Sequence, residues 1–328
     1  GEGGKLLETR RNFRTMKRHD KLPLKKAYYR IFTGMIVIPL VLVLVLSLVI
    51  LGMQYREQAI ENIRGVQKGV AAELQSDVDF MSMRLSQLIN VNDNMVIQYA
   101  VAMNEADQDA RYDAQKKLDQ AGNMVIEPVK DVVSIGFYMK NGNAFFLKSS
   151  IKRTIEETRA KQWYQDALQN LNSVKIGSYQ TRKASDLYLG GSRDQLVLIY
   201  ALSPNSMIDR SQSVEMVVLY QTSDAGNAIR NYNRNYIRGN NKLGIMQIVG
   251  ENGEAIYKTE EIAVKAARGY TCVRTPIELE NATWYIESYI RTAELMQDFV
   301  KIALVILLVA VLIFTLAGYF AGYFIRQI

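Results

Sequence analysis

The sequence predicts an α+β protein in which a mixed helix and sheet domain, built on a long N-terminal helix, lies between two membrane-spanning helices. Two blocks of the chain, Ile31–Tyr55 and Ile302–Ile325, contain no charged residue. Between them, an apolar repeat of helical period gives way to segments in which apolar and polar residues alternate. These two periods indicate an amphipathic helix followed by strands.

Each uncharged block is longer than the roughly 20 apolar residues that cross a bilayer as a helix. A core helix of a water-soluble domain would carry a polar face, and neither block has one. We therefore expect transmembrane helices at residues 31–53 and 302–325. A cleaved signal peptide is the alternative for the first block, but the basic leader is long for one and no small-x-small cleavage site follows.

The charge of residues 1–30 predicts the orientation. Ten Lys/Arg residues are set against Glu2, Glu8 and Asp20, so that 10 − 3 = +7, the net charge of the whole chain. Basic segments beside a span stay in the cytoplasm, so we expect a cytoplasmic tail that contacts anionic membrane lipid and binds no nucleic acid. The protein is then a two-pass cell-membrane protein with both termini cytoplasmic and residues 54–301 outside the cell.

The external region has to fold without internal disulfide bonds, because Cys272 is the only cysteine. A region of this length can bury enough apolar surface to be stable without them. The absence of disulfides fits a bacterial envelope protein better than an animal cell-surface receptor.

A long helix is predicted directly after the first span. Its apolar residues recur every three or four positions, with a mean step of about 3.5, as in a coiled-coil seam. They are Ile60, Ile63, Val66, Val70, Leu74, Val78, Met81, Leu85 and Leu88. This seam either pairs with a second copy in a parallel homodimer or packs on the helix's own domain, and both can hold for different parts. A second helix is expected over Asp107–Val125.

The central region predicts two α/β modules in series. Asn141-Gly142 and Asn252-Gly253 each separate two apolar runs, and Asn-Gly is the strongest short signal for a hairpin turn. Strands are expected at Val133–Met139, Ala144–Lys148, Val174–Gln180, Asp186–Leu189, Gln195–Ala201, Val214–Gln221, Leu243–Val249, Glu254–Lys258, Cys272–Glu278 and Thr283–Tyr289, with helices at Ile155–Leu171 and Asp224–Arg234. The distal module covers about 80–205 and the membrane-proximal module about 214–290.

Several segments carry a resemblance to a known family. "IVIPLVLVLVLSLVILGMQYREQAIENI" resembles the first span and helix start of YesM-like sensor histidine kinases, and "DVVSIGFYMKNGNAFFLK" resembles the first hairpin of a double Cache domain. "KQWYQDALQN" is similar to the Trp-Tyr helix of Cache domains, "QLVLIYALSP" to the strand that ends in Pro, and "YFIRQI" to the start of a HAMP linker. Over about 31–328 the chain resembles the double Cache (PAS-like) extracellular sensor region of a YesM-like bacterial sensor histidine kinase.

This resemblance implies a sensor that relays the binding of a small-molecule ligand across the membrane. The output would be a cytoplasmic HAMP and kinase region that acts on a response regulator, and residues 326–328 would be the start of a truncated HAMP-like linker. The same sensor on a chemoreceptor or a diguanylate cyclase is one alternative. A non-sensing envelope scaffold is an alternative of another class.

No catalytic centre is expected within these residues. The only histidine, His19, lies in the basic tail, so a Ser-His-Asp arrangement cannot form in the external region. No Walker A sequence occurs, and no His/Cys cluster is present for zinc. We expect no cofactor and no metal, and any kinase activity would belong to the parent protein.

A ligand pocket is expected in the distal module. Pockets are mainly apolar and aromatic with a few convergent polar groups. The candidate lining residues are Trp163, Tyr164, Lys161, Tyr138 and Tyr179. Core packing is the alternative role for Trp163, and a buried, filled Trp163 site would favour the scaffold.

The resemblance does not extend to a particular ligand. For double Cache domains that sense amino acids, the resemblance implies an Arg two residues before the Trp and an Asp late in the module. The corresponding residues here are Lys161 and Tyr220. Lys lacks the planar two-pronged grip that Arg offers a carboxylate, so an amino-acid ligand is not implied.

Overall fold

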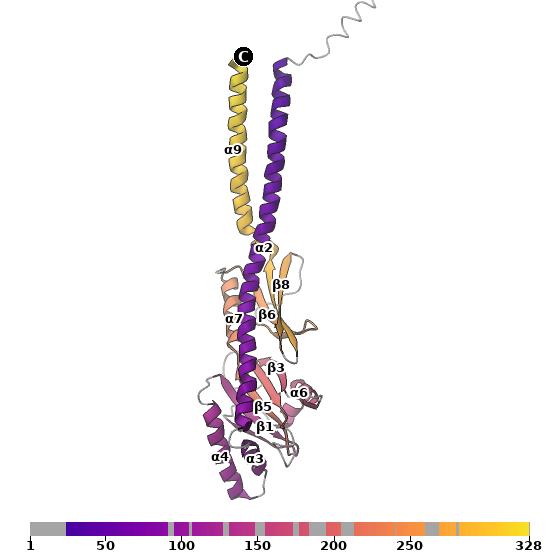
Figure 1. Ribbon diagram of the computed structural model, residues 1–328, viewed down its shortest axis with the longest axis vertical. Helices are drawn as coiled ribbons and strands as arrows, with labels where there is room; N and C mark the ends of the chain where they lie inside the picture. Colours follow the sequence, from indigo (N-terminus) through magenta and orange to yellow (C-terminus); the bar gives the residue numbers. More distant parts are fainter. Residues whose placement is uncertain are drawn as a thin grey trace, which may run out of the picture. The chain divides into compact units, whose positions relative to one another are not determined.

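The computed structural model describes residues 24–90, 95–104, 107–126, 131–147, 155–172, 177–183, 195–204, 213–239, 241–259, 269–279 and 282–327 (Figure 1). The chain divides into two compact units. One is Ala59–Glu294, and the other contains the residues up to Gln58 and from Leu295 onward.

Two apolar helices characterise the unit that contains the chain ends. Helix α2 runs from Leu24 to Asn90 and continues through Pro39, and α9 runs from Gln297 to Gln327. Both are long and apolar enough to cross a membrane, and their most apolar windows are not buried inside the chain. Val43 is 60% exposed and Leu308 is 68% exposed. A core helix of a water-soluble protein would instead have these side chains covered.

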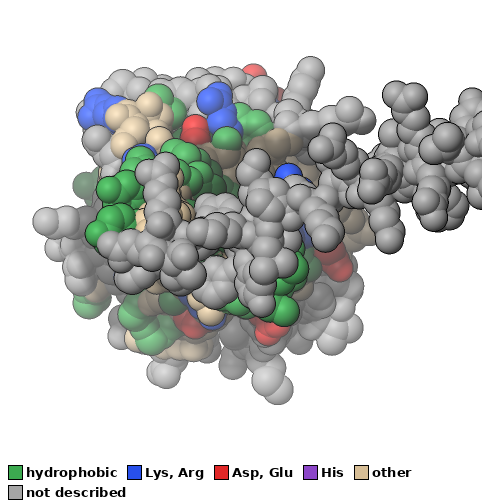
Figure 2. All heavy atoms as spheres, turned by 90° about the horizontal axis from the view of Figure 1, so that it is seen from above, with side chains coloured by type: hydrophobic (Ala, Val, Ile, Leu, Met, Phe, Trp, Pro, Cys, Tyr) green, Lys and Arg blue, Asp and Glu red, His purple; other side chains and the backbone are tan. Residues whose placement is uncertain are grey.

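The two helices of this unit contact each other around Phe299. A Cβ atom at Gly52 would lie 3.0 Å from the Phe299 ring, and the ring centroids of Tyr55 and Phe299 are 6.2 Å apart. Of the described side chains that are visible in Figure 2, many are apolar, and the charged ones are scattered rather than gathered into one patch.

The remainder of α2 forms the spine of Ala59–Glu294. Its predicted seam is almost completely buried, with at most 3% exposure at Ile63, Val70, Leu74, Val78, Met81, Leu85 and Leu88. From Val70 onward these side chains share one core with residues of both sheets. The seam therefore packs on its own domain along this length, and pairing with a second copy through the same side chains is excluded here.

The first sheet has five antiparallel strands in the order β2-β1-β5-β4-β3. They are β1 (Val132–Met139), β2 (Ala144–Leu147), β3 (Gly177–Lys183), β4 (Leu196–Leu202) and β5 (Val214–Thr222). Its helices are α3 (Met95–Ala102), α4 (Gln108–Ile126), α5 (Ile155–Arg159) and α6 (Gln162–Asn172). One face of the sheet joins the core with α2, and the opposite face packs against α6.

The second sheet has four antiparallel strands in the order β7-β6-β9-β8. They are β6 (Ile245–Val249), β7 (Ala255–Tyr257), β8 (Tyr270–Glu278) and β9 (Thr283–Arg291). Helix α7 (Asp224–Ile237) precedes this sheet, and the short α8 (Thr292–Leu295) follows it. Both sheets start with an edge hairpin and place their last strand beside their first, which is the arrangement of PAS-like sheets.

Both predicted hairpins are confirmed. The Asn-Gly turns join β1 to β2 and β6 to β7, with φ values of 98° at Gly142 and 77° at Gly253. Glycine adopts these positive angles without the steric penalty that a Cβ atom would bring.

Other elements differ from the prediction. Val214–Thr222 pairs with β1 and β4 inside the first sheet, although the sequence pattern assigns it to the following module. The predicted helix Ile155–Leu171 is divided into α5 and α6 around Ala160. The predicted strand Asp186–Leu189 and the first residues of the Val174–Gln180 strand lie outside the described residues.

Candidate functional site

Four aromatic side chains meet between α6 and the first sheet, and we call them the aromatic cluster. Tyr138 comes from β1, Tyr220 from β5, and Trp163 and Tyr164 from α6; each is at most 3% exposed. The rings pack edge to face, with centroids 5.1 Å apart for Tyr138 and Tyr164 and 5.9 Å apart for Trp163 and Tyr220. Such pairs contribute about 0.5–1.5 kcal/mol beyond the area they bury.

Two hydroxyl groups lie inside this cluster. The Tyr138 and Tyr220 hydroxyl oxygens are 2.7 Å apart and share a hydrogen bond. Burial raises the pKa of Tyr138 to about 12 and that of Tyr220 well above its ordinary value. Both groups are therefore neutral at physiological pH and offer hydrogen bonds rather than charge.

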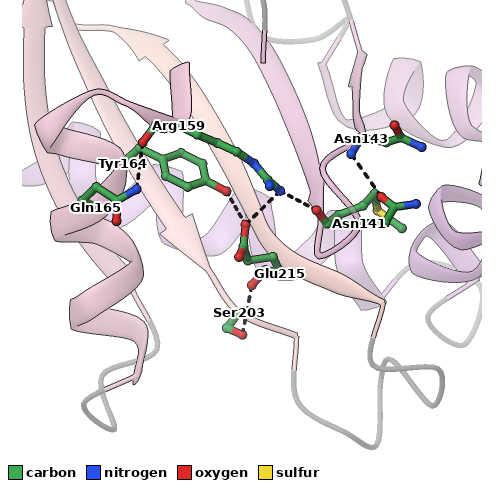
Figure 3. A network of polar contacts seen from close by, with 8 residues as sticks. Asn141, Asn143, Arg159, Tyr164, Gln165, Ser203 and Glu215 are labelled. Carbon is green, nitrogen blue, oxygen red and sulfur yellow. Dashed lines mark hydrogen bonds and ion pairs between the residues drawn. The ribbon is translucent and has the colours of Figure 1, made fainter. Parts of the chain in front are cut away.

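A polar rim borders the cluster (Figure 3). The Tyr164 hydroxyl donates to Glu215 Oε2 over 2.5 Å, and Arg159 Nη2 lies 3.1 Å from the same oxygen. Arg159 also donates to the Met139 carbonyl. Burial raises the pKa of Tyr164, and the hydrogen bond to Glu215 raises it further. The rim therefore holds one cation and one anion in contact, about a quarter exposed at each side chain.

A β-bulge brings Glu215 to this rim. The pairing of β1 with β5 shifts between Tyr138 and Met139, which pair with Met216 and Val214, so Glu215 is the extra residue. In an undisturbed strand Val214 and Met216 would lie on one face, but Val214 belongs to the core with α2 and Met216 to the core under α6. A bulge re-aims side chains in this way, and here it directs Glu215 toward α5 and α6.

Three of the predicted site residues are brought together. Tyr138, Trp163 and Tyr164 all belong to the core under α6. Lys161 is half-buried in the turn before α6, and Arg159 is the cation that pairs with Glu215.

Tyr179 is placed differently from the other four. It lies on edge strand β3 and pairs with Tyr200, and β5 and β4 separate β3 from β1, the strand of Tyr138. The side chain of Tyr179 lies outside what the structure describes, so this residue stays a prediction as a lining residue.

Sequence reasoning missed Arg159 and Glu215 and gave Tyr220 no role in the site. Tyr220 shares the two-residue period of Met216 and Val218, so strand alternation could have placed it on the same face. No local sequence pattern predicts the β-bulge at Glu215.

The described residues contain no group of three or more His, Cys, Asp or Glu side chains that could hold a metal ion. The arrangement consists of buried aromatic rings, two neutral hydroxyl groups bonded to each other and one ion pair at its border. Ligand pockets are lined by groups of these kinds.

No protein-family model matches the sequence, and a search of curated proteins found no relative. Among solved structures, the ligand-binding domain of the Pseudomonas fluorescens chemoreceptor CtaA, in complex with L-isoleucine, is 13% identical with a TM-score of 0.42, covering 74% of this chain and 96% of that one.

Two further solved structures are similar at the same level. A domain from Vibrio parahaemolyticus, described as a sensory box/GGDEF family protein, is 11% identical with a TM-score of 0.46, covering 75% and 99% of the two chains. The extracellular domain of a protein described as a histidine kinase is 10% identical with a TM-score of 0.42, covering 75% and 98%. These likenesses are distant, and we base the function on this chain's own residues.

Proposed function

We propose that this chain is the ligand-sensing external and transmembrane part of a bacterial receptor, with a double Cache external domain and a YesM-like sensor histidine kinase as its parent. The observation that carries the proposal is the aromatic cluster with its Arg159–Glu215 rim. The cluster lies on one face of a sheet whose other face packs on α2. A ligand there would act on a sheet in direct contact with the helix that continues into an apolar span.

The proposed topology follows from charge and apolar length. Residues 1–30 form the cytoplasmic tail, which contacts anionic lipid; 31–53 and 302–325 cross the membrane; 54–301 lie outside; and 326–328 begin a HAMP-like linker. The exposed apolar side chains of α2 and α9 support the membrane location. A parallel homodimer has to use a surface of α2 other than the buried seam.

The proposed mechanism is a population shift. Ligand at the aromatic cluster favours one packing of α5 and α6 on the first sheet, and it can bias the equilibrium only by its difference in affinity for the two states. Trp163, Tyr164 and Tyr138 supply ring surface, Tyr220 supplies a hydroxyl, and Lys161 precedes α6 beside them. Tyr179 stays a predicted lining residue. Helix displacements of about 1–2 Å are sufficient for such switches, and the response regulator receives the output.

A thermal-shift screen of the full chain in detergent micelles tests the proposal. The panel contains amino acids, organic acids, polyamines and sugars. A ligand present at about 100 times its Kd stabilises the folded state by about 2.7 kcal/mol, which raises the unfolding midpoint. Tyr164→Phe removes the hydroxyl that donates to Glu215 and should reduce the shift. Tyr112→Phe is the matched control, because Tyr112 on α4 is 73% exposed. Failure of every compound class, or equal shifts in both variants, would contradict the proposal.

One observation favours a second candidate, a non-sensing envelope scaffold. Trp163 is only 3% exposed and packs against Tyr164 and Tyr220, as a core residue does. In a scaffold, Trp163→Phe would lower the midpoint and no compound would raise it. In a sensor, the variant would also change the response to a compound.

The parent's output separates the remaining alternatives. A phosphoacceptor histidine after residue 328 of the parent protein would support the kinase. A methylated helical hairpin or a cyclase signature there would support the chemoreceptor or the diguanylate cyclase.

A further inference from the structure

One residue breaks the apolar pattern of the α2 seam inside the protein. Gln67 is 0% exposed and lies between Ile63 and Val70, which are 1% and 3% exposed. A buried amide among apolar neighbours is retained only where its polar atoms find partners.

The Gln67 amide is fully engaged by two neighbouring strands. Its Nε2 donates to the Val273 carbonyl and to Ser288 Oγ, both at 2.9 Å, with a longer contact of 3.3 Å to the Ile286 carbonyl. Its Oε1 accepts from Thr275 Oγ1 at 2.6 Å. Val273 pairs with Ser288, and Thr275 with Ile286, in the β8–β9 ladder. The Gln67 amide is thus held by two residue pairs of the β8–β9 ladder that lie two positions apart along the strands.

The apolar seam alone cannot define where α2 sits along this sheet. Because its residues repeat every three or four positions, a slip by one helical turn replaces each apolar side chain with the next. Gln67 has no such equivalent, since a four-residue slip would bring Ile63 or Ala71 to the polar partners. A single buried polar residue is a known means of fixing register in coiled coils.

A second buried amide holds α7 to the same sheet. Asn233 is 1% exposed; its Nδ2 donates to the Met246 carbonyl at 2.9 Å, and its Oδ1 accepts from the Met246 backbone N–H at 2.7 Å. Gln67 and Asn233 thus each hold one helix to the four-stranded sheet through a buried amide.

We propose that Gln67 fixes the register of α2 on the second sheet, so that the helix and the sheet move as one body and α2 cannot slide along it. This inference does not depend on the proposed ligand site. It limits the motions by which any signal passes along α2, because a turn-by-turn slide of the helix past this sheet is excluded while rotation of the joined body is allowed.

Distance measurement between two spin labels tests the inference in the full chain, reconstituted in lipid nanodiscs. One label is attached to Cys272, which is the only cysteine and is exposed on β8. The other is attached at Gln87→Cys, an exposed position on α2 about 30 Å along the helix from Gln67 at 1.5 Å per residue. The protein with Gln67 should give one narrow distance distribution.

Gln67→Leu should add a second distance, displaced by up to about 5.4 Å, the rise of one helical turn. Thr275→Val removes only the hydrogen bond to Gln67 Oε1 and should broaden the distance distribution toward the second distance. This variant replaces Gln67→Leu in the test if Gln67→Leu does not fold. The matched control is Gln75→Leu, because the Gln75 amide bonds to Asp79 on the same helix; this variant should keep the single distance. A single, unchanged distance in Gln67→Leu or Thr275→Val would overturn the proposal, as would equal broadening in Gln75→Leu.

Discussion

Replacing Glu215 with Gln tests whether the rim of the aromatic cluster is held by charge. The variant keeps the size of the side chain and one acceptor oxygen for the Tyr164 hydroxyl. It removes the negative charge that faces Arg159 and that strengthens the short Tyr164 bond. The packing of the rings is left as it is, so any loss of stability reports the electrostatic part of the rim.

The expected loss is about 2 kcal/mol. Hydrogen bonds to charged groups contribute about 1.5–3 kcal/mol, compared with about 1 kcal/mol for neutral ones, so the Tyr164 bond loses roughly 0.5–2 kcal/mol. The pair with Arg159 is 26% and 21% exposed, and solvent screening limits its contribution to under about 1 kcal/mol. For a domain of this size, about 2 kcal/mol lowers the unfolding midpoint by roughly 4–8 °C.

Tryptophan fluorescence can follow this module separately. The chain has two tryptophans; Trp163 lies in the aromatic cluster and Trp284 on β9. In a Trp284→Phe background, thermal unfolding monitored by Trp163 should show the lower midpoint for Glu215→Gln. The matched control is Glu156→Gln, an exposed glutamate in the first turn of α5, which should change stability by less than about 0.5 kcal/mol. Equal midpoints for the two variants would show that the charge of Glu215 does not stabilise the rim.

Three further predictions concern the folded domain. Gly226→Ala should destabilise by about 1–3 kcal/mol through overpacking, because its Cβ would lie 2.4 Å from the Leu196 Cβ; an unchanged urea midpoint would contradict this. Gly69→Ala should raise the free energy of unfolding by up to about 1 kcal/mol, and with it the thermal midpoint, because Ala has the higher helix propensity and a Cβ atom there meets nothing within 4 Å. A lowered midpoint would mean that this face of α2 is covered. Burial raises the pKa of Asp77 above 3.8 despite the hydrogen bond from Ser223, so the folded state binds this proton more tightly and the free energy of unfolding falls as pH rises through the folded pKa. Asp77→Asn should therefore be more stable than the parent at pH 7 and no more stable below pH 3.8, as measured by urea unfolding at both pH values; a uniform difference would argue against burial as the cause.

The parts of the fold that depend on short-range chemistry could be predicted from the sequence. The two Asn-Gly turns fix their hairpins within a few residues, and the Asp224 helix begins as expected, with Ser223 as its N-cap. The uncharged blocks and the α2 seam could be recognised for the same reason, because charge content and periodicity are local properties of the sequence. Trp163 and Tyr164 could be paired because they are adjacent on one helix.

The parts that depend on long-range pairing could not be predicted. Strand β5 lies in the centre of the first sheet between β1 and β4, and chain order does not reveal this pairing. The same non-local strand order puts Tyr179 on β3, which β4 and β5 separate from β1, the strand of Tyr138. Gln67 was passed over within an apolar seam, since its partners are about 200 residues away in sequence.

The proposed orientation of the chain in the membrane can be tested by labelling cysteines in intact cells. Cys272 is exposed and belongs to the region that we place outside the cell. A membrane-impermeant maleimide should therefore label Cys272 without permeabilisation. A Cys272→Ser, Lys25→Cys variant should be labelled only after permeabilisation. Labelling of the basic tail in intact cells, with Cys272 protected, would contradict the proposed orientation.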